Sequence, residues 1–171
     1  VYKRQVVGSF LTQFIIVGML FTYGVLMTEL EKEFGWSRTV LSSIGAAGWL
    51  AWGIFAIPGG YLNDRLGPKI VLGVNGFIFG IGFILFSKSS EVWHLFLIFT
   101  FFIGTGLSTH DISTLSTIAK WFKTKRGLVT SIAKIGTAMG QMVMPPLIAF
   151  LIISFGWRTA TFYPVSYTHL R

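Results

Sequence analysis

The sequence contains no cysteine and very little charge. Without cysteine the chain has no disulfides and no thiol chemistry. Only 12% of its 171 residues are charged, against ~25% in soluble domains, which is too few to solvate a globule of this size. Lys and Arg outnumber Asp and Glu by 14 to 6. Because the apolar composition points to a membrane, this excess indicates topology, and we expect no nucleic-acid partner.

The few charged residues are separated by long uncharged stretches. Four such stretches, each of 18 to 25 residues, occupy 5–28, 39–63, 70–87 and 135–157. About 20 residues of helix cross a hydrocarbon core of ~30 Å, so each stretch is long enough to span a bilayer. A fifth stretch of similar length, 92–119, includes His110 and Asp111. The sequence therefore predicts an all-α, polytopic membrane protein in contact with the lipid bilayer.

We expect five spanning helices and the start of a sixth. The predicted helices are 6–28, 39–62, 69–87, 92–119 and 126–154, and the sixth apolar segment opens with WRTATFY. The segments VYKRQ (1–5) and PVSYTHLR (164–171) resemble translated sequencing adapters. We therefore expect non-native ends at 1–5 and 164–171, around a truncated N-terminal transmembrane bundle at 6–163.

Basic residues in the predicted loops set the expected orientation. The loops after the second and fourth helices contain Arg65, Lys69, Lys120, Lys123, Lys125 and Arg126, whereas the opposite loops contain Lys32, Arg38, Lys88 and Arg158. Cytoplasmic loops of membrane proteins carry an excess of Lys and Arg. We therefore predict a multi-pass protein of the cell (inner or plasma) membrane with a cytoplasmic N-terminus.

The stretch GGYLNDRLGPK (59–69) is the strongest motif, and we expect it in the turn between the second and third helices. Its glycines permit a tight turn, and Asp64 can face the positive N-terminal end of a neighbouring helix. An ordinary short loop is the alternative. The stretch resembles the major facilitator superfamily signature G-x-L-x-D-R-x-G-x-K/R, which it matches at Gly60, Leu62, Asp64, Arg65, Gly67 and Lys69.

Three other stretches narrow this resemblance. EFGWSRTVLS (33–42), WFKTKRGLVTSIAKIGTAMGQMVMPPL (121–147) and FGWRT (155–159) look like the monocarboxylate transporter and oxalate/formate antiporter branch. The resemblance implies the N-terminal six-helix half of a major facilitator fold, with a missing C-terminal half of the same protein as its partner. It also implies that the 59–69 motif, through Asp64 and Arg65, locks one state of an alternating-access cycle.

Two opposite charges are expected at one depth in the membrane. Asp111 lies nine residues before Lys120, hence ~13 Å deep, and Lys134 lies eight residues after Arg126, hence ~12 Å deep. Charges there require a partner or a wet cavity. Polar side chains recur at helical spacing around both, and helix one offers two more: Ser108 and Thr114; Thr130, Thr137 and Gln141; Gln13 and Tyr23.

These residues predict a central polar site for a small organic anion and for protons, and the resemblance implies an anion of the monocarboxylate or oxalate/formate type. Lys134 would attract the carboxylate of the substrate, with Asp111 as counter-ion and proton acceptor. The alternative is a purely structural ion pair. His110 is a second candidate for proton coupling, since the ordinary pKa of imidazole is about 6.5, and packing between helices is its alternative.

The sequence favours secondary transport over catalysis. It offers no positioned nucleophile, no metal-ligand spacing and no phosphate loop, so we expect no enzyme, no metal and no cofactor. Proton symport and anion exchange both stay open. The alternatives are uptake or efflux of a different solute and a non-transporting membrane sensor with the same fold, because a fold does not determine a substrate.

Overall fold

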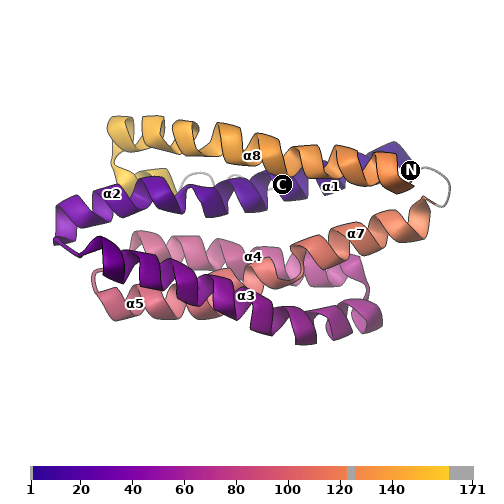
Figure 1. Cartoon of the computed structure of the whole chain (residues 1–171), viewed down its shortest axis with the longest axis horizontal. Coiled ribbons are helices and arrows are strands. Elements are labelled where there is room, and N and C mark those ends of the chain that lie inside the picture. The colour runs from indigo at the N-terminus through magenta and orange to yellow at the C-terminus, as the bar shows by residue number, and fades with distance from the viewer. Residues whose placement is uncertain (1, 123–125, 162–171) are drawn as a thin grey trace.

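A computed structural model of the chain describes residues 2–122 and 126–161, and all regular structure within these ranges is helical (Figure 1). The elements are α1 (Tyr2–Phe21), α2 (Tyr23–Phe34), α3 (Arg38–Leu66), α4 (Pro68–Ser87), α5 (Val92–Leu97), the π-helix η1 (Ile98–Ile103), α6 (Gly104–Ser108), α7 (His110–Trp121) and α8 (Arg126–Phe155). The predicted all-α architecture is confirmed.

Five helical segments are long and apolar enough to cross a membrane: Gln5–Phe34, Arg38–Leu66, Pro68–Ser87, Val92–Trp121 and Arg126–Phe155. They correspond one to one with the five predicted spans. The chain is helical again from Trp157 to Thr161, where the sixth segment was expected to begin. Lys123, Lys125 and the segment 164–171 lie outside the described residues.

The first two spans extend further than expected. The first ends at Phe34 and the second at Leu66, beyond the predicted ends at 28 and 62. Gly35 and Gly67 follow with φ of 68° and 83°, which favour glycine and end the helices. Hydrophobicity places the ends too early because polar residues continue a helix past its apolar part. The motif is therefore helical through Leu66, and the prediction that it forms the turn is wrong except near Gly67.

The fourth span is interrupted, although one continuous helix was predicted. η1 replaces one stretch of α-helix, and Thr109 separates α6 from α7 with a ψ of −4°. The buried Thr109 hydroxyl accepts a hydrogen bond from the side-chain amide of Asn75 on α4. This contact with a neighbouring helix accompanies the break, and helical spacing within the span does not reveal it.

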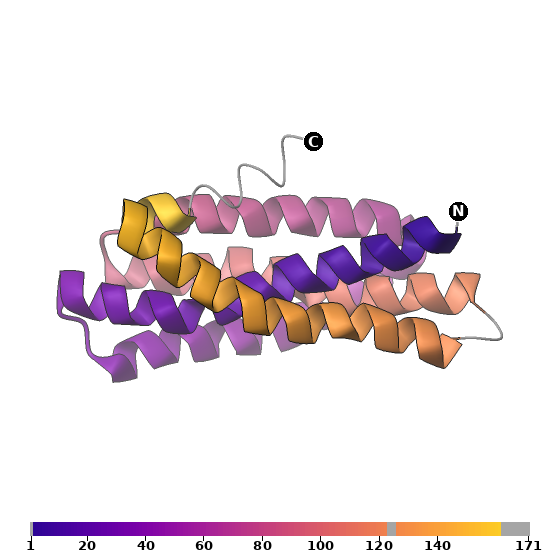
Figure 2. The same cartoon turned by 90° about the horizontal axis from the view of Figure 1, so that it is seen from above.

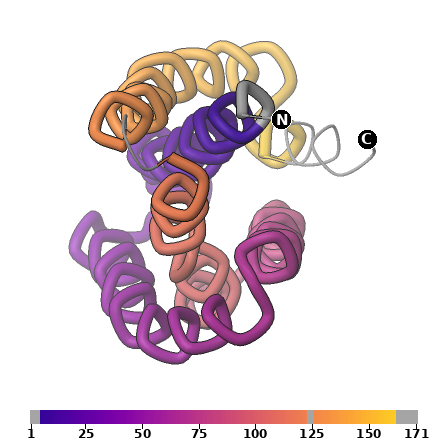
Figure 3. Tube along the Cα trace, turned by 90° about the vertical axis from the view of Figure 1, so that its right-hand side faces the viewer, coloured from indigo at the N-terminus to yellow at the C-terminus, as the bar shows by residue number. Residues whose placement is uncertain are grey.

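The spans form two groups around α7. Seen along the bundle, α1 and α8 lie on one side of α7, and α3 and α4 lie on the other (Figure 3). The paired path of α1 and α8 is also visible from above (Figure 2). α3 packs on η1 and α6, and α4 packs on the same two elements from its own side. α7 also contacts α8, so Asp111 on α7 and Lys134 on α8 belong to neighbouring helices.

Two glycines allow α1 and α8 to approach closely. A Cβ atom at Gly136 would lie 2.4 Å from the carbonyl oxygen of Phe10, and one at Gly140 would lie 2.3 Å from that of Phe14. Real Cβ atoms essentially never come so near, so only glycine fits at this spacing. This is the close approach expected of a small-xxx-small face between membrane helices.

The buried core is apolar, and so is much of the outer surface. The largest cluster of buried side chains gathers residues from all five spans, including Leu26, Ile44, Phe86 and Ile148. Large apolar side chains on α3 and α8 are exposed in the isolated chain, among them Ile57, Leu50, Met142 and Ile153. Exposed apolar faces of this extent need lipid or another protein surface to cover them.

Candidate functional site

An ion pair joins the first turn of α7 to α8. Lys134 Nζ lies 2.5 Å from Asp111 Oδ1, and no other acidic partner of Lys134 occurs among the described residues. The side chains remain 41% and 33% exposed, respectively. The pair is therefore open to a solute on one side, whereas a sealed ion pair would be enclosed by neighbouring helices.

Two further polar side chains extend the pair to α1. The Gln13 amide donates a hydrogen bond of 2.7 Å to Asp111 Oδ1, and the Thr137 hydroxyl donates one of 2.9 Å to Gln13 Oε1. Gln13 is fully buried. Because three spans contribute, the group of Gln13, Asp111, Lys134 and Thr137 depends on tertiary structure; we call it the polar cluster.

His110 faces a different direction from the polar cluster. It is buried, its Nδ1 lies 2.6 Å from the carbonyl oxygen of Leu107, and its ring packs 5.7 Å from that of Trp52. A carbonyl only accepts, so Nδ1 carries the proton. Nε2 lies 3.8 Å from Asp111 Oδ2, too far for a hydrogen bond. The structure places His110 between helices, and its role in proton coupling stays a prediction.

Several predicted site residues lie away from the cluster. The Tyr23 hydroxyl donates to the carbonyl of Leu41 at 2.7 Å. Gln141 is half-buried one turn beyond Thr137, and the described residues give its side chain no hydrogen bond. Ser108 and Thr114 donate hydrogen bonds to backbone carbonyls on their own span, and Thr130 lies one turn before Lys134 on α8. Ser108 lies before the break that precedes α7, and its side chain is directed toward α3 and α4.

The signature motif lies at the junction of α3 and α4. Gly60, Leu62, Asp64 and Arg65 belong to the last turns of α3, Gly67 makes the turn, and Lys69 is in the first turn of α4. The guanidinium of Arg65 covers the ring of Tyr61 at 4.5 Å. Asp64 is exposed and has no hydrogen bond or ion pair to any described residue. Its carboxylate is thus available to a partner outside the described bundle.

One functional candidate was missed by sequence reasoning. Asn63, inside the motif, is fully buried and accepts a hydrogen bond of 2.7 Å from Ser113 while donating one of 3.3 Å to Ser116. These contacts tie the end of α3 to α7, two residues beyond Asp111. The sequence signal for this residue was the position of Asn63, a side-chain amide at the end of an apolar stretch.

A second group was also missed, at the opposite end of the bundle. Glu33 accepts from the Trp157 indole and lies 3.0 Å from the guanidinium of Arg158, which donates to the Ser87 carbonyl at 3.1 Å. The group links the ends of the first and third spans to the start of the sixth segment. Opposite charges beside two similar motifs, FGWSRT and FGWRT, were its sequence signal.

Chemically, the polar cluster is suited to holding an anion rather than a metal. Within residues 2–122 and 126–161, no three His, Cys, Asp or Glu side chains gather closely enough to hold a metal ion. The cluster instead presents a primary ammonium, one amide and one hydroxyl. A carboxylate is the natural ligand of such donors, because charge-assisted hydrogen bonds to it are about twice as strong as neutral ones.

The chain is similar to several known transport proteins. The chain is 30% identical to the agnestins efflux protein of Paecilomyces divaricatus and 27% identical to monocarboxylate transporter 13 of Rattus norvegicus, in each case over 91% of the chain. It spans 37% and 36% of the lengths of these two relatives. An MFS-type transporter from a Phoma species is 30% identical, with 56% of its length covered.

A family model provides the decisive match. It describes the Major Facilitator Superfamily and covers residues 9–165, which is most of the chain and includes all of the polar cluster. The relatives are named as transporters, and the five spans make the chain a multi-pass helical membrane protein. The chain therefore belongs to the Major Facilitator Superfamily.

Proposed function

We propose that this chain is the N-terminal half of a secondary active transporter that moves a small organic anion across a membrane. The single observation that supports this most strongly is the half-exposed ion pair of Lys134 and Asp111 inside a membrane span. Ionisable groups in such positions are costly, and where they occur they usually mark substrate or ion pathways.

The polar cluster supports a carboxylate as the substrate group. Lys134 would bind the carboxylate, while Gln13 and Thr137 supply neutral donors beside it. Asp111 now occupies the position that a substrate carboxylate would take next to the ammonium. A substrate that displaces Asp111 would give anion exchange, whereas protonation of Asp111 would give proton symport.

Transport would proceed by alternating access. The complete transporter would rock its two halves around the polar cluster, with the motif at 59–69 stabilising one state. The exposed carboxylate of Asp64 and the face of Arg65 are available to the second half for this purpose. We place the N-terminus in the cytoplasm of a cell-membrane protein, on the basis of the positive-inside distribution.

A second candidate is the efflux of a different solute. The similarity to a protein named for efflux of agnestins favours it. The two candidates differ in direction and solute, not in mechanism. Uptake of a labelled monocarboxylate into right-side-out vesicles, compared with uptake into inverted ones, separates them.

The test of the proposal is counterflow of labelled acetate and oxalate in proteoliposomes with the complete transporter that contains this chain. We expect Lys134→Ala to reduce exchange to background while membrane insertion is unchanged, because the ammonium is the only cation in the cluster. Lys88→Ala is the matched control, since Lys88 is exposed at a span end. Normal exchange by Lys134→Ala would refute the site, and binding without exchange in the wild type would favour a sensor.

A further inference from the structure

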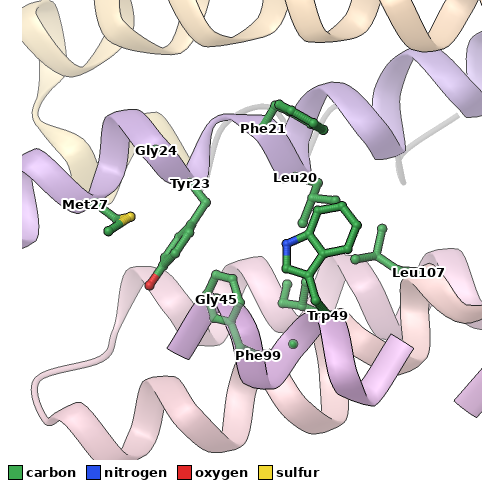
Figure 4. Close-up of a pocket in the computed structure, with 11 residues that line it drawn as sticks. Leu20, Phe21, Tyr23, Gly24, Met27, Gly45, Trp49, Phe99 and Leu107 are labelled. Carbon is green, nitrogen blue, oxygen red and sulfur yellow. The ribbon is translucent and has the colours of Figure 1, made fainter. Parts of the chain in front are cut away.

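An apolar cavity lies outside the polar cluster. It measures about 220 Å³ and is located between α1–α2, α3 and the η1–α6 part of the fourth span (Figure 4). Its wall is apolar, with the side chains of Leu20, Tyr23, Met27, Trp49, Phe99 and Leu107. The one hydroxyl among these side chains, on Tyr23, is already bonded to the carbonyl of Leu41. The cavity therefore offers a surface for an apolar group.

The volume suits a six-membered ring or a branched alkyl group. A cavity of about 150 Å³ lined by Leu, Ile and Phe is enough to bind benzene. The rings of Tyr23 and Phe99 pack at 4.4 Å and form one aromatic wall. Trp49 lies across the cavity from Tyr23 (Figure 4) and is 49% exposed, so the cavity is accessible from outside the described bundle.

The cavity and the polar cluster share one face of α1, where Gln13 and Leu20 are seven residues apart. On the fourth span, Leu107 and Asp111 lie four residues apart, on either side of the break at Thr109. Four residues of helix correspond to a rise of about 6 Å. The cavity wall therefore begins about one to two helical turns from the polar cluster along α1 and the fourth span.

Aromatic side chains connect the two regions directly. Trp49, in the cavity wall, packs 4.9 Å from Trp52, whose ring lies 5.7 Å from that of His110. His110 in turn lies 3.8 Å from the free oxygen of Asp111. A row of packed side chains thus runs from the cavity wall to the charged pair.

We propose that this cavity receives the apolar group of the transported anion, so that the substrate is a carboxylate with an aryl or branched alkyl group. This inference rests on the proposed function, since Lys134 must hold the carboxylate. It narrows the class of substrate within that function, because formate and oxalate have no apolar group that could fill such a cavity. The neighbouring cation favours an organic anion over the acyl chain of a lipid, which carries no charge along its length.

Gly24 offers a direct way to fill the cavity. It belongs to the cavity lining, and a Cβ atom added there would meet nothing within 4 Å. Gly24→Leu therefore adds apolar volume at the cavity lining, and its first side-chain carbon meets no atom within 4 Å. Gly53→Leu is the matched control, because Gly53 also has nothing within 4 Å but lies outside the cavity lining.

The experiment measures half-saturation concentrations for phenylacetate and for acetate by counterflow in the complete transporter. We expect Gly24→Leu to raise the value for phenylacetate at least tenfold, because a single methylene in an apolar pocket already changes selectivity about 10-fold or more. The value for acetate should change less than about twofold, since acetate needs only the polar cluster. Gly53→Leu should change neither value.

Trp49→Ala provides a second variant that removes part of the wall rather than filling the cavity. Because Trp49 is half exposed, its loss should leave folding intact while raising the half-saturation concentration for phenylacetate and sparing that for acetate. If both anions respond alike to these variants, or if the wild type exchanges acetate but not phenylacetate, the cavity assignment is overturned. If the wild type exchanges neither anion, the proposed function itself fails.

Discussion

The contact between Gly136 and α1 offers a test of how the fold positions the polar cluster. Gly136→Ala would place a methyl group 2.4 Å from the carbonyl oxygen of Phe10, so the helices must separate by about 1 Å to restore ordinary contact. The hydrogen bond between Thr137 and Gln13 is 2.9 Å long and would then exceed the limit for a hydrogen bond. The substitution should damage packing and the site together.

The expected cost follows from overpacking, which destabilises a well-packed core by about 1–3 kcal/mol. Each 1.4 kcal/mol is tenfold in an equilibrium constant, so the unfolded fraction should rise about 5- to 150-fold. Gly127→Ala is the matched control on the same helix, where a Cβ atom meets nothing within 4 Å. Since Ala is a better helix former than Gly by up to about 1 kcal/mol, the control should be neutral or stabilising.

The assay is unfolding of the purified chain in mixed micelles as the denaturing detergent increases, followed by circular dichroism. We expect the free energy of unfolding of Gly136→Ala to fall below that of both the wild type and Gly127→Ala. Equal stability of the two alanine variants would show that α1 and α8 tolerate a wider spacing, and the packing argument would be refuted.

Two other predictions concern the fourth span. Asp111→Asn should leave anion exchange active and remove its dependence on a pH gradient, because an amide cannot take up the coupled proton; unchanged dependence in vesicle assays would exclude Asp111 as the coupling residue. Asn63→Ala leaves the buried Ser113 hydroxyl without its acceptor, which should cost about 1–3 kcal/mol of unfolding free energy. A detergent titration that shows no loss would contradict this.

The number and type of spans follow from the sequence because they depend on local composition. A lipid environment requires long apolar helices, so the gaps between charges locate four of the five spans, and the apolar run around Asp111 locates the other. The helix ends do not follow, since α2 and α3 extend through polar residues to Gly35 and Gly67. Hydropathy locates the part of a helix that lies in the bilayer core. The end of the helix is set by the backbone conformation of the glycine that follows it.

The polar cluster could be predicted only in part. Depth along consecutive antiparallel helices suggested that Asp111 and Lys134 are level, and the structure brings them together. Tyr23 and Ser108 were expected nearby, but their directions depend on tertiary contacts such as the one that breaks the helix at Thr109.

In the proposed function, one oxygen atom connects substrate binding to the attachment of α7. Oδ1 of Asp111 accepts from both Gln13 and Lys134, so this atom ties α7 to α1 and to α8 at once. An anion that competes for Lys134 must spend part of its own binding free energy on weakening that tie. Anion binding at Lys134 and the packing of α7 against α1 and α8 are then reciprocally linked. A change that weakens this packing should raise the apparent affinity for the anion, and a change that strengthens it should lower that affinity.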